Sequence, residues 1–122
     1  MKKMKEFRKI SVIGLGLIAS SICLTLRQKD PTIKLLGYDK DKVVRNRAKK
    51  IGLCKVESNL DNAVSGSQLI ILCVPVGQMQ AVTQKLKKII EPGTTITDVG
   101  SVKLSVIEEI ESNICLLYTS DA

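Results

Sequence analysis

The sequence contains no histidine and no tryptophan, and it has only one phenylalanine and two tyrosines in 122 residues. So few aromatic rings argue against a nucleic-acid module that stacks bases on exposed side chains. Without histidine, a zinc site would need clustered cysteine thiolates. The four cysteines, Cys23, Cys54, Cys73 and Cys115, have neither a CxxC pair nor regular spacing. We therefore predict no metal site and a reduced, cytoplasmic protein with free thiols.

Long hydrophobic runs are also absent, and those present are too short to span a bilayer. The basic N-terminus superficially resembles a signal peptide, but a strand and glycines follow it without a convincing cleavage site. The net charge of +7 is concentrated in residues 2–5 and 40–50. Such a charge can attract nucleic acid or anionic lipid, but we interpret it as a solvated helix face and a frayed terminus. We predict neither nucleic-acid nor membrane partners.

Aliphatic residues supply most of the hydrophobic fraction of 44%, as is typical of a parallel sheet covered by helices on both faces. The length fits a single domain. Asp30-Pro31 ends the first helix, Gly52 closes the second, and Ser58 or Asn59 caps the third. Strands are predicted over 9–13, 33–38, 54–57, 69–74 and 94–97, alternating with helices over 17–29, 41–51, 59–64, 78–90 and 102–112. This alternation predicts an α/β fold with a doubly wound parallel sheet.

The segment Ile10–Ser21, ISVIGLGLIASS, places a G-x-G-x-x-A pattern between the first strand and the first helix. Gly14 permits the tight turn, Gly16 lets a pyrophosphate approach the backbone, and Ala19 allows close packing of helix and strand. The phosphates would lie on unpaired N–H groups at the helix N-terminus. The pattern predicts a dinucleotide site.

Asp39 ends the second strand, where a carboxylate can accept hydrogen bonds from the adenosine ribose. An acid here repels a 2′-phosphate and favours NAD. Ala19 and the neighbouring Lys40, Lys42 and Arg45 favour NADP. Because the carboxylate lies directly at the ribose, we predict NAD in preference to NADP.

Two later segments end strands at the same predicted crevice. Val74 and Pro75 follow the fourth strand and would border the path to the nicotinamide, although Pro75 alone could serve as a strand terminator. TDVGSVK (97–103) follows the fifth strand. On its own, Ser101 is typical of a helix N-cap.

Four segments together resemble the prephenate dehydrogenase family, which includes the arogenate dehydrogenases: GLGLIASS (14–21), GYDKD (37–41), LCVPVGQM (72–79) and TDVGSVK (97–103). The resemblance runs from Lys9 to about Ser112 and implies a Rossmann-type NAD(P)-binding domain. It also implies NAD(P)-dependent oxidative decarboxylation of prephenate or arogenate in tyrosine biosynthesis. Hydride leaves the ring carbon bearing the 4-hydroxyl, carbon dioxide departs, and the ring becomes aromatic.

The resemblance gives roles to individual residues. It makes Ser101 an active-site serine that hydrogen-bonds near the substrate hydroxyl and the catalytic histidine. The segment 14–19 would hold the pyrophosphate. The predicted cofactor-binding residues are Gly14, Leu15, Gly16, Leu17, Ile18, Ala19, Asp39, Lys40, Val74 and Pro75.

The sequence departs from the family pattern in two ways. Ala19 stands where members commonly have glycine, which bears on the choice of cofactor. The histidine that the family carries some tens of residues after Ser101 is absent. We therefore expect residues 1–114 to be the dinucleotide-binding part of a longer enzyme, without its all-helical C-terminal domain. That domain would carry the substrate-binding arginines and the homodimer interface, so the fragment should be inactive. Residues 115–122, CLLYTSDA, look like a read-through tail.

Two alternative functions remain open on the residues alone. One is another two-domain NAD(P)-dependent enzyme, of the β-hydroxyacid dehydrogenase or pyrroline-carboxylate reductase type, which shares the strand–GxGxxG–helix opening. The other is a non-catalytic module that senses NAD. The first would not be expected to carry TDVGSVK after the fifth strand, and the VP and DVGS segments argue against the second.

Overall fold

A computed structural model describes residues 7–98 of the chain. Strands and helices alternate along it: β1 Lys9–Ile13, α1 Leu17–Lys29, β2 Lys34–Tyr38, α2 Lys42–Lys50, β3 Lys55–Val56, α3 Leu60–Val64, β4 Leu69–Leu72, α4 Val76–Ile89 and β5 Thr95–Asp98. Ser101, the helix predicted over 102–112 and the tail predicted over 115–122 lie outside the described residues. Within 7–98, no helix has the length and apolar character needed to cross a membrane.

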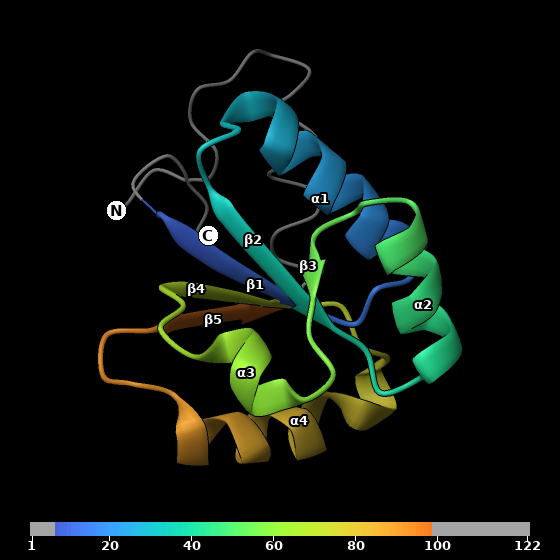
Figure 1. Cartoon of the computed structure of the whole chain (residues 1–122). Helices are drawn as coiled ribbons and strands as arrows, with labels where there is room; N and C mark the ends of the chain where they lie inside the picture. Colours follow the sequence, from blue (N-terminus) through green and yellow to red (C-terminus); the bar gives the residue numbers. More distant parts are fainter. Residues whose placement is uncertain (1–6, 99–122) are drawn as a thin grey trace.

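All five strands are parallel and lie in the order β3-β2-β1-β4-β5. Helices α1 and α2 cover one face of the sheet, and α3 and α4 lie on the other (Figure 1). The predicted doubly wound α/β sheet is therefore confirmed over the described residues.

Two hydrophobic clusters fill the spaces between the sheet and its helices. On the α1 side, Ile10 and Val12 of β1 pack with Cys23 and Leu26 of α1. On the α3 and α4 side, Ile13 and Ile70 pack with Val64 and Leu86. Because side chains alternate across a strand, β1 and β4 contribute to both clusters, as expected for central strands buried on both faces.

The element boundaries agree with the sequence patterns most closely around β1 and α1, whose limits coincide with the prediction. Asn59 caps α3 by accepting a hydrogen bond from the Asn62 amide at 2.8 Å. Gly52, with φ of +69°, follows the C-terminus of α2 as predicted.

The largest difference in boundaries lies between β4 and α4. The apolar run suggested a strand through Val74, but β4 ends at Leu72, which pairs with the last residue of β1, Ile13. Pro75 is the N-cap of α4, which begins at Val76 rather than at Gln78. The strand therefore ends where its partner ends.

Candidate dinucleotide-binding site

The candidate site lies at the carboxyl edge of the sheet, where β1 and β4 are neighbours. The helix that follows β1 packs on one face, and the helix that follows β4 packs on the other (Figure 1). Two adjacent parallel strands whose connections diverge in this way leave a crevice between the following loops, and open α/β sheets bind their ligands there. The glycine-rich segment and the Val74-Pro75 segment are the two loops at this point.

The backbone conformation and the close approach of β4 require a glycine at position 14. Its φ is +96°, and a Cβ at this position would lie 2.6 Å from the carbonyl oxygen of Cys73 at the end of β4. The Gly14 amide donates to the Tyr38 carbonyl at 2.7 Å. Any larger residue would therefore separate the turn from both neighbouring strands.

Gly16 differs from Gly14 because nothing in the protein excludes a side chain there. A Cβ on Gly16 would meet no atom within 4 Å. Gly16 is also the N-cap of α1, and no side chain caps the helix. The positive end of the helix dipole thus has no side-chain cap and has free space beside Gly16, which suits an anion.

The Asp39 carboxylate links the glycine-rich segment to the turn that follows β2. One oxygen accepts a hydrogen bond from the Leu15 amide at 2.9 Å, and the other accepts from the Asp41 amide at 2.9 Å. A carboxylate has about four lone-pair positions, so acceptor capacity is left for ligand hydroxyls. Asp39 therefore positions the glycine-rich turn as well as being available to a ribose.

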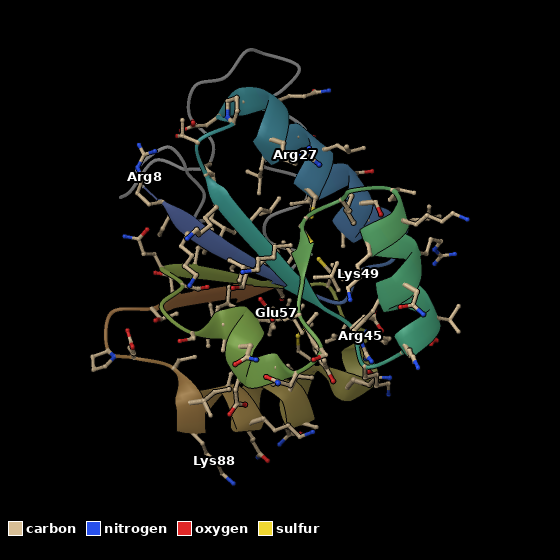
Figure 2. All side chains as sticks on the ribbon, viewed as in Figure 1. Arg8, Arg27, Arg45, Lys49, Glu57 and Lys88 are labelled. Atoms are coloured by element: carbon tan, nitrogen blue, oxygen red, sulfur yellow. The ribbon has the colours of Figure 1, made fainter. Side chains whose placement is uncertain are left out.

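Arg45 holds the backbone on which Asp39 sits. Its guanidinium donates to the Asp39 carbonyl at 2.8 Å and to the Lys40 carbonyl at 3.3 Å, and it lies over the Tyr38 ring at 5.8 Å. Figure 2 shows Arg45 near the junction of β2 and α2. Lys40 itself is exposed.

Apolar side chains border the crevice on both sides of the switch point. Leu17 at the start of α1 and Val76 at the start of α4 are each 88% exposed, and Ile18 is also exposed. Val74 is half-buried and packs against the cluster below α4. Ala19 is buried where α1 meets the sheet. This edge of the sheet thus combines an uncapped helix N-terminus with a less polar border.

The fold gathers the predicted residues of segment 14–19, Asp39, Lys40, Val74 and Pro75 at one edge of the sheet. Ser101 lies outside the described residues, so its predicted role stays a prediction. Sequence reasoning missed two features, the bond from the Leu15 amide to Asp39 and the support that Arg45 gives to Asp39. The spacing of Tyr38 and Arg45 in GYDKDKVVR gave no signal for either. In the part of the chain described, no three metal-ligating side chains cluster.

Comparison with known proteins identifies the family. The model of the prephenate dehydrogenase nucleotide-binding domain matches residues 22–120. The chain belongs to this family. The resemblance inferred from the four sequence segments is thereby confirmed.

Individual relatives agree with the family assignment. A cyclohexadienyl dehydrogenase of Zymomonas mobilis is 37% identical over 112 residues, which cover 91% of this chain and 38% of that protein. The crystal structure of Synechocystis arogenate dehydrogenase is 29% identical, with a TM-score of 0.68 over 77% of this chain and 33% of that one.

A third relative is similar in fold. The crystal structure of A. aeolicus prephenate dehydrogenase with hydroxyphenyl propionate and NAD+ is 23% identical. Its TM-score is 0.69 over 86% of this chain and 37% of that one. The chain thus spans roughly a third of the length of these relatives.

Proposed function

We propose that this chain is the NAD-binding part of an enzyme that decarboxylates prephenate or arogenate oxidatively in tyrosine biosynthesis. The observation that carries the proposal is the uncapped N-terminus of α1 at Gly16, open to an anion and next to the Asp39 carboxylate. A dinucleotide needs both features, a cradle for its pyrophosphate and an acceptor for its ribose.

The residues of the site fit NAD. The amides at the start of α1 would hold the pyrophosphate, and Asp39 would accept from the adenosine ribose while Arg45 fixes the backbone of Asp39. Val74 and Pro75 would border the nicotinamide. A bound NAD would supply the acceptor for the hydride of the ring carbon bearing the 4-hydroxyl. Ser101 orients the substrate hydroxyl.

Relatives support this choice of cofactor and substrate class. The A. aeolicus enzyme was crystallised with NAD+ and hydroxyphenyl propionate, and the similar enzymes are named for cyclohexadienyl and arogenate substrates. The family match favours this reaction over the β-hydroxyacid and pyrroline-carboxylate alternatives and over an NAD sensor.

We also infer the setting of the complete protein. It acts in the cytoplasm as a homodimer on a small-molecule substrate, without nucleic-acid or membrane partners. Residues 1–114 belong to the dinucleotide-binding domain, and residues 115–122 are a non-native tail. Size-exclusion chromatography of the complete protein tests the dimer, and sequencing genomic DNA across the last codons tests the tail.

A pair of glycine variants tests the site. Gly16→Ala should leave the melting temperature nearly unchanged, because its Cβ meets no protein atom, but it should weaken NAD binding in titration calorimetry. Gly14→Ala should instead cost about 1–3 kcal/mol of stability, the usual penalty for a strained backbone, because φ is +96° and the Cys73 carbonyl is close. Unchanged NAD affinity in Gly16→Ala would place the pyrophosphate elsewhere.

A further inference from the structure

Two cysteines that are distant in sequence meet below the candidate site. Cys23 lies in the middle of α1 and is fully buried. Cys54 directly precedes β3, is half-buried, and packs against the same hydrophobic cluster. The two thiols pack in the same hydrophobic cluster, close enough to interact, and both are free.

Arg27 of α1 supports the segment that carries Cys54. It follows Cys23 by four residues on α1, so the two side chains share one helix face. The Arg27 guanidinium donates to the carbonyls of Gly52 and Leu53, the latter at 3.2 Å. These residues immediately precede Cys54, so Arg27 fixes the segment that brings Cys54 against Cys23. Figure 2 shows Arg27 on α1, on the side of the molecule that also carries β3 and α2.

Cys54 is accessible from outside, whereas Cys23 is not. An open cavity of about 850 Å³ between α1 and β3 has Cys54 in its lining. Arg27 and Lys55 contribute positive charge to the same cavity, and Leu24, Ile33 and Ile51 contribute apolar surface. A small reagent can therefore reach Cys54 first, because the fully buried Cys23 is not among the residues that line this cavity.

The sulfur of Cys54 also lies near the candidate site, on the side of β2 where Gly37 leaves space. A Cβ at Gly37 would lie 2.7 Å from the Cys54 sulfur and 2.8 Å from a methyl carbon of Leu15. Both side chains thus occupy the space that the glycine leaves free. The Leu15 amide is the donor to Asp39. The Cys54 sulfur and the Leu15 side chain are thus neighbours across Gly37, one residue side chain away from the hydrogen bond that holds the glycine-rich turn.

We propose that Cys54 and Cys23 form a redox-active thiol pair, oxidised by a hydroperoxide to a disulfide that disturbs the Leu15–Asp39 hydrogen bond. The modification site rests on contacts that are independent of the cofactor. Only its effect on NAD affinity rests on the proposed function.

The chemistry balances in two steps. The Cys54 thiolate attacks one oxygen of the hydroperoxide, an S–O bond forms, the O–O bond breaks, and water or an alcohol leaves with a proton. The Cys23 sulfur then attacks the Cys54 sulfur, an S–S bond forms, and the S–O bond breaks. The departing oxygen takes the Cys23 proton and leaves as water. The two thiols lose two electrons together, and the hydroperoxide gains them.

The electrostatic environment agrees with this order of events. Interaction with the Cys23 thiol lowers the pKa of Cys54, against the effect of partial burial, and the positive charge of Arg27 lowers it further. The same interaction and deeper burial raise the pKa of Cys23. Burial raises the pKa of Cys73 to about 12. Because the thiolate is the nucleophile, Cys54 is the thiol that reacts with the oxidant.

Disulfide mapping tests the pair in the whole 122-residue chain, carrying Cys115→Ser so that only three thiols compete. After treatment with hydrogen peroxide, tryptic digestion separates Cys23 and Cys54, because cleavage sites at Arg27 and Lys50 lie between them. We expect one linked peptide pair, Cys23 with Cys54, with the loss of two hydrogens. Cys73→Ser, the matched control, should leave this link intact, and Cys54→Ser should abolish it. A link through Cys73, or no link at all, would overturn the proposal.

Hydrogen exchange of the Leu15 amide tests the coupling without any cofactor. Oxidation should speed its exchange, and dithiothreitol should restore the slow exchange. NAD affinity, measured by titration calorimetry, should fall about fivefold or more on oxidation, a common size for coupling between sites. Unchanged exchange at Leu15 would overturn the coupling. If the reduced chain did not bind NAD, the proposed function would fail, whereas the mapping and the exchange would still decide the present inference.

Discussion

At the scale of single residues, Asp39 supports the fold at the place where we propose that a ligand binds. Its carboxylate accepts from the amides of Leu15 and Asp41, so it fixes the glycine-rich turn before any ligand arrives. Preorganisation of this kind lowers the cost of ordering a loop on binding. The proposed ribose role follows from the position of Asp39 at a strand end. The bond to Leu15 could not be predicted, because it depends on how closely β1 and β2 approach.

The two roles of Asp39 predict two separate effects of substitution. Asp39→Ser should narrow or reverse the preference for NAD over NADP, because it removes the charge that repels a 2′-phosphate. It should also cost about 1–3 kcal/mol of stability, because the buried Leu15 amide loses its acceptor. Asp39→Asn, the matched control, keeps an acceptor oxygen and should lose less stability while shifting the preference in the same direction. Calorimetric titration with both dinucleotides measures the preference, and tighter NADP binding to the unmutated chain would contradict it.

Ser101 carries a prediction for the complete enzyme. As an active-site group, it positions the substrate rather than the fold, so Ser101→Ala should lower kcat at least ~10-fold, equivalent to ~1.4 kcal/mol of barrier. The melting temperature and the NAD affinity should change little. As a helix N-cap, the same substitution would instead cost ~0.5–2 kcal/mol of stability and leave turnover intact. Steady-state kinetics and thermal melts on the same preparation distinguish the two roles.

At the scale of elements, local patterns predicted which segments are helical or extended better than they predicted where each segment ends. The limits of α1 follow from signals within the chain, glycines before it and Asp30-Pro31 after it. The end of β4 follows from its partner, because Leu72 pairs with the last residue of β1. The contact of Cys23 with Cys54 likewise left no periodic signal, since it depends on α1 packing beside β3.

A buried hydroxyl network connects β1 with α3 and predicts an element-scale effect. The fully buried Ser11 of β1 donates to the Ala63 carbonyl and shares a hydrogen bond with Ser67. Ser11→Ala leaves these buried polar groups without that partner, so it should cost about 1–3 kcal/mol in chemical denaturation. Ser21→Ala, on the exposed face of α1, should stay within about 0.5 kcal/mol of the unmutated chain. Equal effects of the two substitutions would show that the network contributes nothing to stability.

At the scale of the whole molecule, the features proposed to bind NAD lie together. The open N-terminus of α1, the Asp39 carboxylate and the Val74-Pro75 segment are all at the same edge of the sheet. The aliphatic composition and the alternation of strands and helices were sufficient to predict this arrangement. The chain spans roughly a third of the length of its relatives, and the residues that bind the ring of the substrate could not be predicted from it.

We predict that the 122-residue chain binds NAD but does not turn over prephenate. The chain should bind NAD, because the cradle at Gly16 and the Asp39 carboxylate are both formed by residues 7–98. It should produce no detectable NADH from prephenate, because it contains no histidine to serve as the acid–base group implied by the family, a contribution of roughly 10²–10⁴-fold. An NADH absorbance assay, run beside a calorimetric titration that shows the chain is folded and binds NAD, measures both. A full-length family member at the same concentration provides the positive control. Clear turnover by this chain would show that hydride transfer proceeds without the histidine, and the assignment of acid–base chemistry to that group would be wrong.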